Sequence, residues 1–228
     1  MNNPQTEPGR LVTRLSQEVS REDRLGEGTC AWYAAPAPER ETFSEDGALI
    51  LPLDEMRSVL AVADGVGGQA AGALAAEMAL ETIRAAVTGA VAGTDSVRAT
   101  LLDGIETANQ LIANLSLGAA TTLAAMEIDG RSVRPYHIGD SQIVIVGQRG
   151  LIRLETMAHS PVGYAVEAGL LCEKEALHHE DRHLVSNILG SPDMRIEIGS
   201  PILLRPRDTV LIARDGLFDN MHLSGIVE

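Results

Sequence analysis

Two apolar segments of this chain each end in an aspartate that is followed by a glycine. The run over residues 58–63 leads into Asp64, and the run over residues 209–213 leads, one residue later, into Asp215. Continuous apolar runs of this length are typical of buried strands, so each carboxylate is expected at the edge of a sheet. Carboxylates without nearby His or Cys suit hard divalent cations such as Mg²⁺ or Mn²⁺. The pattern therefore predicts a metal site that contains Asp64 and Asp215.

Two further carboxylates strengthen this prediction. Asp140 lies between the two segments in Gly139-Asp140-Ser141, and Asp219 follows Asp215 by four residues. One Asp-Gly pair after a strand is an ordinary turn signal. The repeated design, with additional carboxylates in similar settings, indicates a shared cation instead.

Other interpretations of these motifs are weaker. Gly65-x-Gly67 before a helix is similar to a dinucleotide fingerprint, but Asp64 would repel a pyrophosphate and a second βα unit is absent. Ser141 lacks the Gly-x-Ser-x-Gly context of a hydrolase nucleophile. The polar tract over residues 178–183 is typical of a solvated loop. His137, on an apolar strand, is expected to be a satisfied core residue.

The surrounding elements predict an α+β fold. Helical spacing of apolar residues covers 69–87, and Asp95 or Ser96 can cap a second helix that extends to about Leu117. Residues 34–47 are expected to form a surface loop, because they contain two prolines and clustered charges. Turns at Asp129-Gly130 and at residues 148–150 indicate antiparallel hairpins. Further strands are expected within 26–33 and over 121–128, 133–138, 142–147, 151–154, 195–204 and 209–213, and a partly helical segment over 164–180.

Composition narrows the classes of function and location. The formal net charge of −14 disfavours binding to nucleic acid or to an anionic membrane surface. Cys30 and Cys172 form no disulfide framework, and no N-terminal apolar run resembles a signal peptide. A cytoplasmic protein is expected, with a loosely ordered segment over 1–20 and one domain over 21–228.

The ordered set of motifs resembles the metal-dependent serine/threonine protein phosphatases of the protein phosphatase 2C type. The resemblance covers roughly residues 24–228, and each motif alone is weak. The matching pieces are Val62-Ala-Asp64-Gly65-Val-Gly67-Gly68, Ala120-Thr121-Thr122-Leu123, His137-Ile-Gly139-Asp140-Ser141-Gln142, His159-Ser160, Asn187-Ile-Leu-Gly190 and Ala213-Arg214-Asp215-Gly216-Leu217-Phe218-Asp219-Asn220.

This resemblance implies two antiparallel β-sheets packed as a sandwich between helix layers, with a binuclear Mn²⁺ or Mg²⁺ centre at one sheet edge. Asp64 would bridge the two ions, the Gly65 carbonyl would bind one of them, and Asp215 would ligate the centre from its other side. Asp140 and Asp219, together with Asp215, match a third and weaker metal site. A water molecule activated by the two ions would hydrolyse phosphoserine or phosphothreonine. The implied partners are a phosphoprotein substrate and a cognate Ser/Thr kinase.

The chain departs from the family pattern at its N-terminal element, which in the family contains an Arg and then a Glu-Asp pair. The counterpart chosen from the sequence is Arg24 with Glu27, where Gly28 replaces the Asp; Arg24, or alternatively Arg21, would hold the substrate phosphate.

A second departure is Arg214, which stands where the family usually has Ser. The chain also stops at Glu228, before the family's last metal-binding Asp, so a C-terminally truncated catalytic domain is expected. These departures keep open an alternative hypothesis, a non-catalytic relative that acts as a regulatory or binding module.

Overall fold

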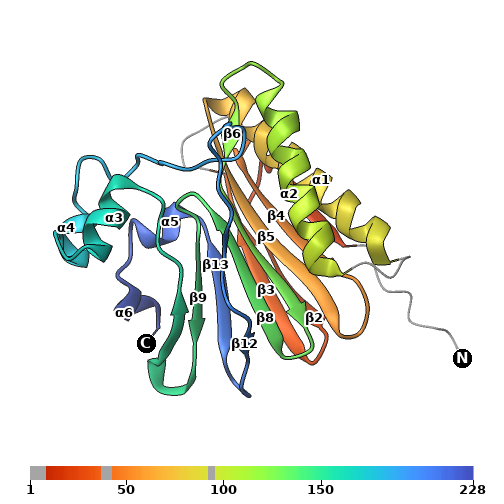
Figure 1. Cartoon of the computed structure of the whole chain (residues 1–228). Helices are drawn as coiled ribbons and strands as arrows, with labels where there is room; N and C mark the ends of the chain where they lie inside the picture. The colour runs from red at the N-terminus through yellow and green to blue at the C-terminus, as the bar shows by residue number, and fades with distance from the viewer. Residues whose placement is uncertain (1–8, 37–42, 92–95, 228) are drawn as a thin grey trace, which may run out of the picture.

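Two antiparallel sheets form the centre of the molecule in the computed structural model, which describes residues 9–36, 43–91 and 96–227 (Figure 1). The first sheet has the strand order β1-β4-β5-β7-β8-β11, with β6 beside β5 and β12 beside β8. Its strands are β1 Arg10–Thr13, β4 Asp46–Pro52, β5 Arg57–Val66, β6 Ala120–Thr121, β7 Leu123–Asp129, β8 Ser132–Ile138, β11 Glu197–Ile198 and β12 Ile202–Leu203.

The second sheet is smaller and has the order β10-β9-β13. Its strands are β9 Gln142–Val146, β10 Ile152–Glu155 and β13 Thr209–Ala213, and a separate hairpin pairs β2 Val19–Leu25 with β3 Gly28–Ala34. The helices are α1 Gln69–Val91, α2 Val97–Ala113, α3 Pro161–Glu167, α4 Glu173–Ala176, α5 Asp215–Phe218 and α6 Leu223–Ile226. The α+β fold with antiparallel sheets is thereby confirmed. The long helices α1 and α2 lie against the first sheet, and α3 to α6 are short and lie beside the second (Figure 1).

Two apolar clusters hold these layers together. Between the first sheet and the helices, Leu80 and Ile83 of α1 and Leu101 of α2 are fully buried. Between the two sheets, Met126 of β7 packs in one cluster with Ile143 of β9. The core depends on aliphatic residues because the chain has only 3% aromatic residues. Burial of such side chains stabilises the fold by about 25 cal/mol per Å² of apolar surface.

Local sequence explains the hairpins and the start of α2. Gly130 adopts φ +57° between β7 and β8, a conformation that glycine reaches without a Cβ penalty. Residues 148–150 form the turn between β9 and β10. The Ser96 hydroxyl accepts a hydrogen bond from the Ala99 N–H and caps α2, as predicted.

Several element boundaries differ from the sequence-based expectations. The loop expected over 34–47 ends earlier, because Asp46 and Gly47 already belong to β4; residues 37–42 lie outside the described residues. Helix α2 ends at Ala113 rather than near Leu117. The strand expected over 195–204 is divided into β11 and β12 by Gly199-Ser200-Pro201, since proline has no N–H for a ladder.

The expected loose segment over 1–20 contains ordered structure. Strand β1 pairs with β4 at the edge of the first sheet, and β2 begins at Val19. Residues 1–8 lie outside the described residues.

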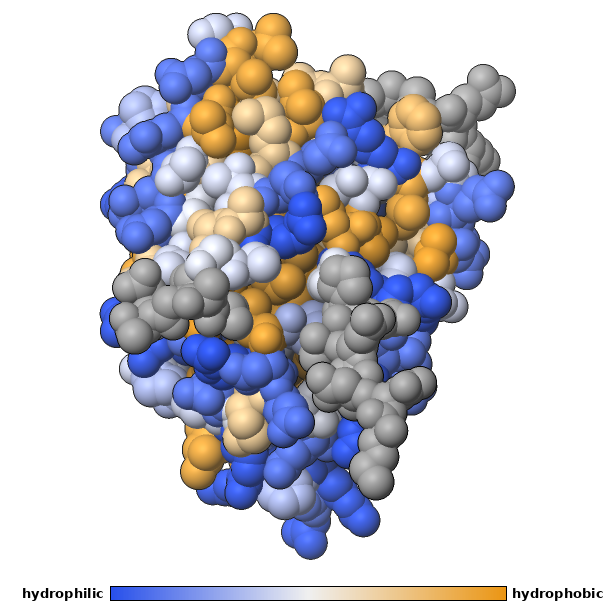
Figure 2. Space-filling view, turned by 90° about the vertical axis from the view of Figure 1, so that its right-hand side faces the viewer, coloured by the Kyte–Doolittle hydropathy of each residue, from blue (hydrophilic) through white to orange (hydrophobic). Residues whose placement is uncertain are grey.

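Within the described part of the chain, none of the helices combines the length and the apolar character needed to cross a bilayer. Figure 2 views the side of the molecule that lies to the right in Figure 1, where hydrophobic patches alternate with bands of hydrophilic residues.

Candidate metal centre

Strand β5 brings Asp64 to the sheet edge beside a second carboxylate. In the antiparallel register, Asp46 of β4 pairs directly with Asp64. The backbone of Asp64 is fixed from the other side, because its carbonyl accepts hydrogen bonds from the Thr122 N–H and the Thr121 hydroxyl, both at 2.9 Å. The Asp64 N–H in turn donates to the Thr122 hydroxyl oxygen at 3.1 Å. The Ala-Thr-Thr-Leu motif thus positions the backbone that carries Asp64.

Glycines let the chain turn closely after Asp64. A Cβ atom at Gly65 would lie 2.2 Å from the Gly72 carbonyl oxygen, so a larger residue cannot occupy this contact between β5 and α1. Gly67 has φ +110°, and a Cβ there would lie 2.3 Å from the Gly118 carbonyl oxygen. The glycines after Asp64 are therefore required by close backbone packing and by left-handed geometry.

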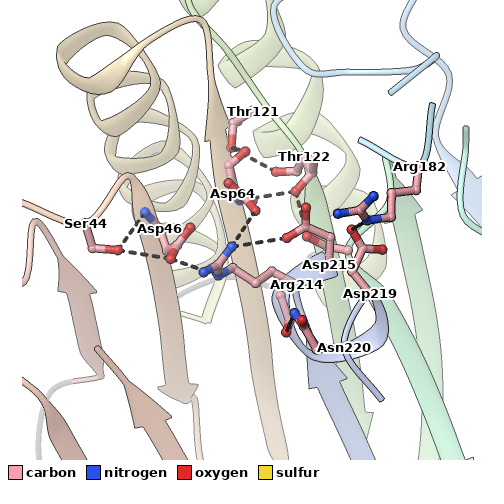
Figure 3. A network of polar contacts seen from close by, with 12 residues as sticks. Ser44, Asp46, Asp64, Thr121, Thr122, Arg182, Arg214, Asp215, Asp219 and Asn220 are labelled. Atoms are coloured by element: carbon pink, nitrogen blue, oxygen red, sulfur yellow. Dashed lines mark hydrogen bonds and ion pairs between the residues drawn. The ribbon is translucent and has the colours of Figure 1, made fainter. Parts of the chain in front are cut away.

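Asp215 reaches the same place from the second sheet (Figure 3). It begins α5 directly after β13 and Arg214, and the guanidinium of Arg214 links the carboxylates of the two sheets. Arg214 Nη1 lies 3.1 Å from Asp215 Oδ1 and 3.4 Å from Asp64 Oδ2, while its Nε lies 2.9 Å from Asp46 Oδ2. Three carboxylates, from β4, β5 and the start of α5, thus surround one cationic group.

The Gly139-Asp140 turn is held by a network of buried polar groups. The Ser141 and Thr122 hydroxyls lie 2.7 Å apart, which joins this turn to the backbone site of Asp64. His159 brackets Gly139 with two hydrogen bonds: its N–H donates to the Gly139 carbonyl, and its Nδ1 accepts from the Gly139 N–H. The Asn187 amide also donates to His159 Nδ1 at 3.0 Å. The motif residues His159 and Asn187 therefore fix the backbone of Gly139, directly before Asp140.

Asp140, Asp215 and Asp219 line one open cavity of about 300 Å³, to whose walls α3, α4, α5 and α6 contribute. The single turn of α5 brings Asp215 and Asp219 to neighbouring positions on one helix face. Arg182 also lines this cavity, and its Nε lies 3.9 Å from Asp219 Oδ2. The cavity is the space from which a ligand could approach the carboxylates.

The raised pKa values of these carboxyl groups indicate that nearby positive charge does not compensate their negative charges. Burial raises the pKa of Asp64 to about 8, and the charges of Asp46 and Asp215 add to this effect, while Arg214 opposes it. Burial together with the Asp215 charge raises the pKa of Asp140 to about 7. The pKa of Asp219 is raised for the same two reasons. One guanidinium does not balance this group of acids.

This donor set fits a divalent cation. The side-chain ligands are all carboxylate oxygens, which Mg²⁺ and Mn²⁺ prefer. Asp46, Asp64 and Asp215 already converge on a point that a positive group occupies. Asp140 and Asp219 are close enough to Asp215 for its charge to raise the pKa of both. The five carboxylates together therefore have the chemistry of a cation site.

The structure does not bring Arg24 or Glu27 to this centre. Both lie at the β2–β3 turn, where Arg24 Nε contacts the Gly26 carbonyl and Glu27 is exposed. A Cβ at Gly26 would lie 3.3 Å from the Glu55 carbonyl, so this turn lies against the β4–β5 turn. Strand β5 separates that turn from Asp64 by roughly 20 Å, at about 3.3 Å per residue. The placement of Arg24 and Glu27 at the centre is contradicted, and Arg21 belongs to the same hairpin.

Asp46 is the residue that sequence reasoning missed. The family resemblance asks for a Glu-Asp pair, and Glu45-Asp46 is such a pair, immediately before the apolar run that forms β4. Ser44 supports Asp46, because its hydroxyl donates to Asp46 Oδ2 at 3.0 Å. The Glu-Asp pair lies within residues 34–47, where the prolines and clustered charges favour a surface loop over a strand.

His137 is buried, as expected, but it is not satisfied. Only 1% of it is exposed, and neither ring nitrogen makes a hydrogen bond of normal geometry to any atom of the described residues. Its ring centroid lies 4.3 Å from that of His159, whose Nε2 lies 2.9 Å from Glu197 Oε2. Burial, with a contribution from the nearby His159, lowers the pKa of His137 to about 4. His137 is therefore a neutral residue behind the Asp140 turn.

Comparison with known proteins identifies the family to which this geometry belongs. The sequence model of protein phosphatase 2C matches residues 39–225. The chain belongs to the protein phosphatase 2C family. The matched range contains Asp46, Asp64, Asp140, Asp215 and Asp219, and it excludes Arg24 and Glu27.

Relatives and solved structures agree with this assignment. A putative protein phosphatase 2C-type protein of Streptococcus pyogenes is 32% identical over 181 residues, which cover 75% of this chain and 71% of the relative. Protein phosphatase PhpP of Streptococcus pneumoniae is 32% identical over 173 residues, covering 71% and 68% of the two chains. Relatives of this protein phosphatase 2C chain are thus themselves named as protein phosphatases.

The serine/threonine phosphatase of S. agalactiae superposes with a TM-score of 0.70 at 26% identity, over 96% of this chain and 84% of that one. The catalytic domain of the phosphatase PstP, solved with two manganese ions, gives a TM-score of 0.66 at 25% identity, also over 96% and 84%. These structures share the two-sheet architecture described above.

Proposed function

We propose that this protein phosphatase 2C member hydrolyses phosphoserine and phosphothreonine in proteins with the help of Mn²⁺ or Mg²⁺ held by Asp46, Asp64 and Asp215. The observation that carries the proposal is the convergence of these three carboxylates from two sheets on one point. The Gly65 carbonyl adds a candidate ligand, and Asp140 with Asp219 forms a candidate site for a further ion.

The charge of the site supports a requirement for metal. A phosphate dianion that enters the cavity meets Asp140, Asp215 and Asp219, which would repel it. When bound, a divalent cation would supply Lewis-acid stabilisation of the phosphoryl oxygens and would lower the pKa of a water molecule. Asp64 would orient such an ion, because Thr121 and Thr122 fix its backbone. Ser141 is fully buried and its hydroxyl lies 2.7 Å from that of Thr122, so we assign it a structural role and not that of a nucleophile.

The setting of the reaction follows from the same chemistry. A phosphoserine or phosphothreonine substrate requires a kinase that modified the same hydroxyl, and such a kinase is the expected partner. Cys30 and Cys172 are both free thiols, which supports a reducing, cytoplasmic compartment.

Hydrolysis of a phosphothreonine peptide tests the proposal. The parent protein should release phosphate with Mn²⁺ and lose this activity in EDTA. Asp215→Asn should lower kcat/KM by at least about a hundredfold, because it removes a carboxylate of the cluster and leaves its shape. Asp103→Asn, an exposed position on α2, is the matched control and should keep parental activity. Undiminished hydrolysis in EDTA, or by Asp215→Asn, would contradict the proposal.

A second candidate function is a non-catalytic binding module of the same fold, and one specific observation favours it. Arg214 already pairs with the three carboxylates that would hold the metal. Calorimetric titration with Mn²⁺ separates the two functions. Stoichiometric binding favours the phosphatase, and no binding at millimolar Mn²⁺ favours the module.

A further inference from the structure

The position of Arg214 relative to the three carboxylates has a geometric consequence for metal binding. A single nitrogen, Nη1, lies within 3.4 Å of Asp64 Oδ2 and 3.1 Å of Asp215 Oδ1, and Nε holds Asp46. A divalent ion held between Asp64 and Asp215 would draw on the same two carboxylates that Arg214 pairs with, and Mg²⁺ binds carboxylate oxygens at about 2.0–2.1 Å. The guanidinium and the ion cannot occupy that place together.

The charge balance explains why the arginine adopts this position. Asp46, Asp64 and Asp215 bring up to three negative charges together at the edges of two sheets, and the charge-assisted hydrogen bonds of Arg214 offset part of their repulsion. These carboxylates raise the pKa of Arg214, although its burial opposes the effect, so the group remains charged. Arg214 thus stabilises the arrangement of carboxylates without a metal.

The Arg214 side chain is nevertheless accessible to solvent and is not confined by a neighbouring side chain at Gly216. It is 42% exposed, and the end of the guanidinium lies over Gly216, which has no side chain. An ideal Cβ at Gly216 would lie only 3.0 Å from Arg214 Cζ. The arginine can therefore rotate toward solvent without disturbing the core.

We infer that Arg214 is a tethered cation that competes with the divalent metal for Asp64 and Asp215, and so sets the metal affinity of this chain. The inference rests on the proposed metal-dependent function, and it names the residue that regulates metal uptake. The metal-free state is held together by the guanidinium, and metal uptake requires its displacement. Metal affinity is therefore weaker than the carboxylates alone would give.

Calorimetric titration of Mn²⁺ into the full chain tests this inference without an activity assay. Arg214→Ser removes the competitor, and we expect its Kd for Mn²⁺ to be at least about tenfold tighter than that of the parent, or about 1.4 kcal/mol. The matched control is Arg84→Ser, which removes the same charge from an Arg that pairs with Glu81 on α1. Its Kd should equal that of the parent within twofold.

A second variant covers the case in which Arg214→Ser does not fold without metal. Gly216→Ala keeps every charge but places a methyl group against the guanidinium, so it should tighten Mn²⁺ binding by at least about twofold. Equal affinities in the parent and in the folded variants would overturn the competition. If neither the parent nor Arg214→Ser binds Mn²⁺, the metal-dependent function itself fails; binding with equal affinity removes only the role of Arg214.

Discussion

Replacing Asp64 with Asn should have two opposite effects. It should stabilise the metal-free protein, and it should abolish the stabilisation that Mn²⁺ confers. Asp64→Asn retains the shape of the side chain and removes a buried charge that lies beside Asp46 and Asp215. Asn can still accept a hydrogen bond from Arg214. The variant therefore isolates the charge of the carboxylate from its packing.

The magnitude follows from the pKa of this carboxyl. Its rise from 3.8 to about 8 means that, between these values, the folded state binds more protons than the unfolded state. The contribution of Asp64 to the stability of the metal-free protein consequently falls as pH rises from about 4 to 8. At about 1.4 kcal/mol per pKa unit, the Asp64 carboxyl would lower the free energy of unfolding near pH 7.5 by about 5 kcal/mol if it acted alone. Because Asp46 and Asp215 are coupled to it, we expect about 2–3 kcal/mol of this to be recovered when Asp64 is replaced.

Thermal unfolding in EDTA measures this effect. Asp64→Asn should raise Tm at pH 7.5 by roughly 5–10 °C, at about 2–4 °C per kcal/mol for a chain of this size. The gain should shrink toward pH 4.5, because near the ordinary pKa of 3.8 the carboxyl also takes up a proton in the unfolded state. Mn²⁺ should then raise the Tm of the parent and not that of the variant, because only the parent retains the charged ligand.

Asp103→Asn on the exposed side of α2 is the control for the change in net charge, and it should leave Tm within about 1 °C. A lower Tm for Asp64→Asn in EDTA at pH 7.5 would refute the electrostatic reasoning. An equal Mn²⁺ response in parent and variant would refute the assignment of Asp64 as a ligand.

Two further predictions concern residues around the centre. Gly65→Ala should lower the free energy of unfolding by more than about 2 kcal/mol, because its Cβ would meet the Gly72 carbonyl. Gly89→Ala in α1 meets no atom within 4 Å and should raise the free energy of unfolding by about 0.5–1 kcal/mol. Urea unfolding compares the two variants, and equal effects would contradict the packing argument. His137 is neutral in the folded protein, so its contribution to the free energy of unfolding decreases as pH falls from 6.5 to 4. His137→Leu should reduce this acid-dependent loss of stability by about 2–3 kcal/mol, as measured by urea unfolding across that pH range. Unchanged pH dependence would show that His137 has a hydrogen-bond partner.

Local sequence patterns were sufficient to predict several parts of the site. Asp64 and Asp215 each follow an apolar strand, and glycines next to them signal close backbone turns, so strand, carboxylate and turn are recognisable within ten residues. Asp140 and Asp219 were found in the same way. Hairpin turns and the Ser96 cap likewise depend on neighbouring residues only. Short-range sequence signals therefore predicted the fold class and four of the carboxylates.

The residues that complete the centre become apparent only from the three-dimensional packing of the strands. The prediction of Glu27 as part of the centre was wrong because strand neighbours are set by long-range pairing, and β4, not the β2–β3 hairpin, lies beside Asp64. The partners of Arg214 come from three separate elements, so no local pattern identifies them. Burial also left His137 without a well-formed hydrogen bond to the described part of the chain, although its strand sequence resembles that of any core residue. Contacts between distant segments are fixed by packing and register, which a single sequence does not display.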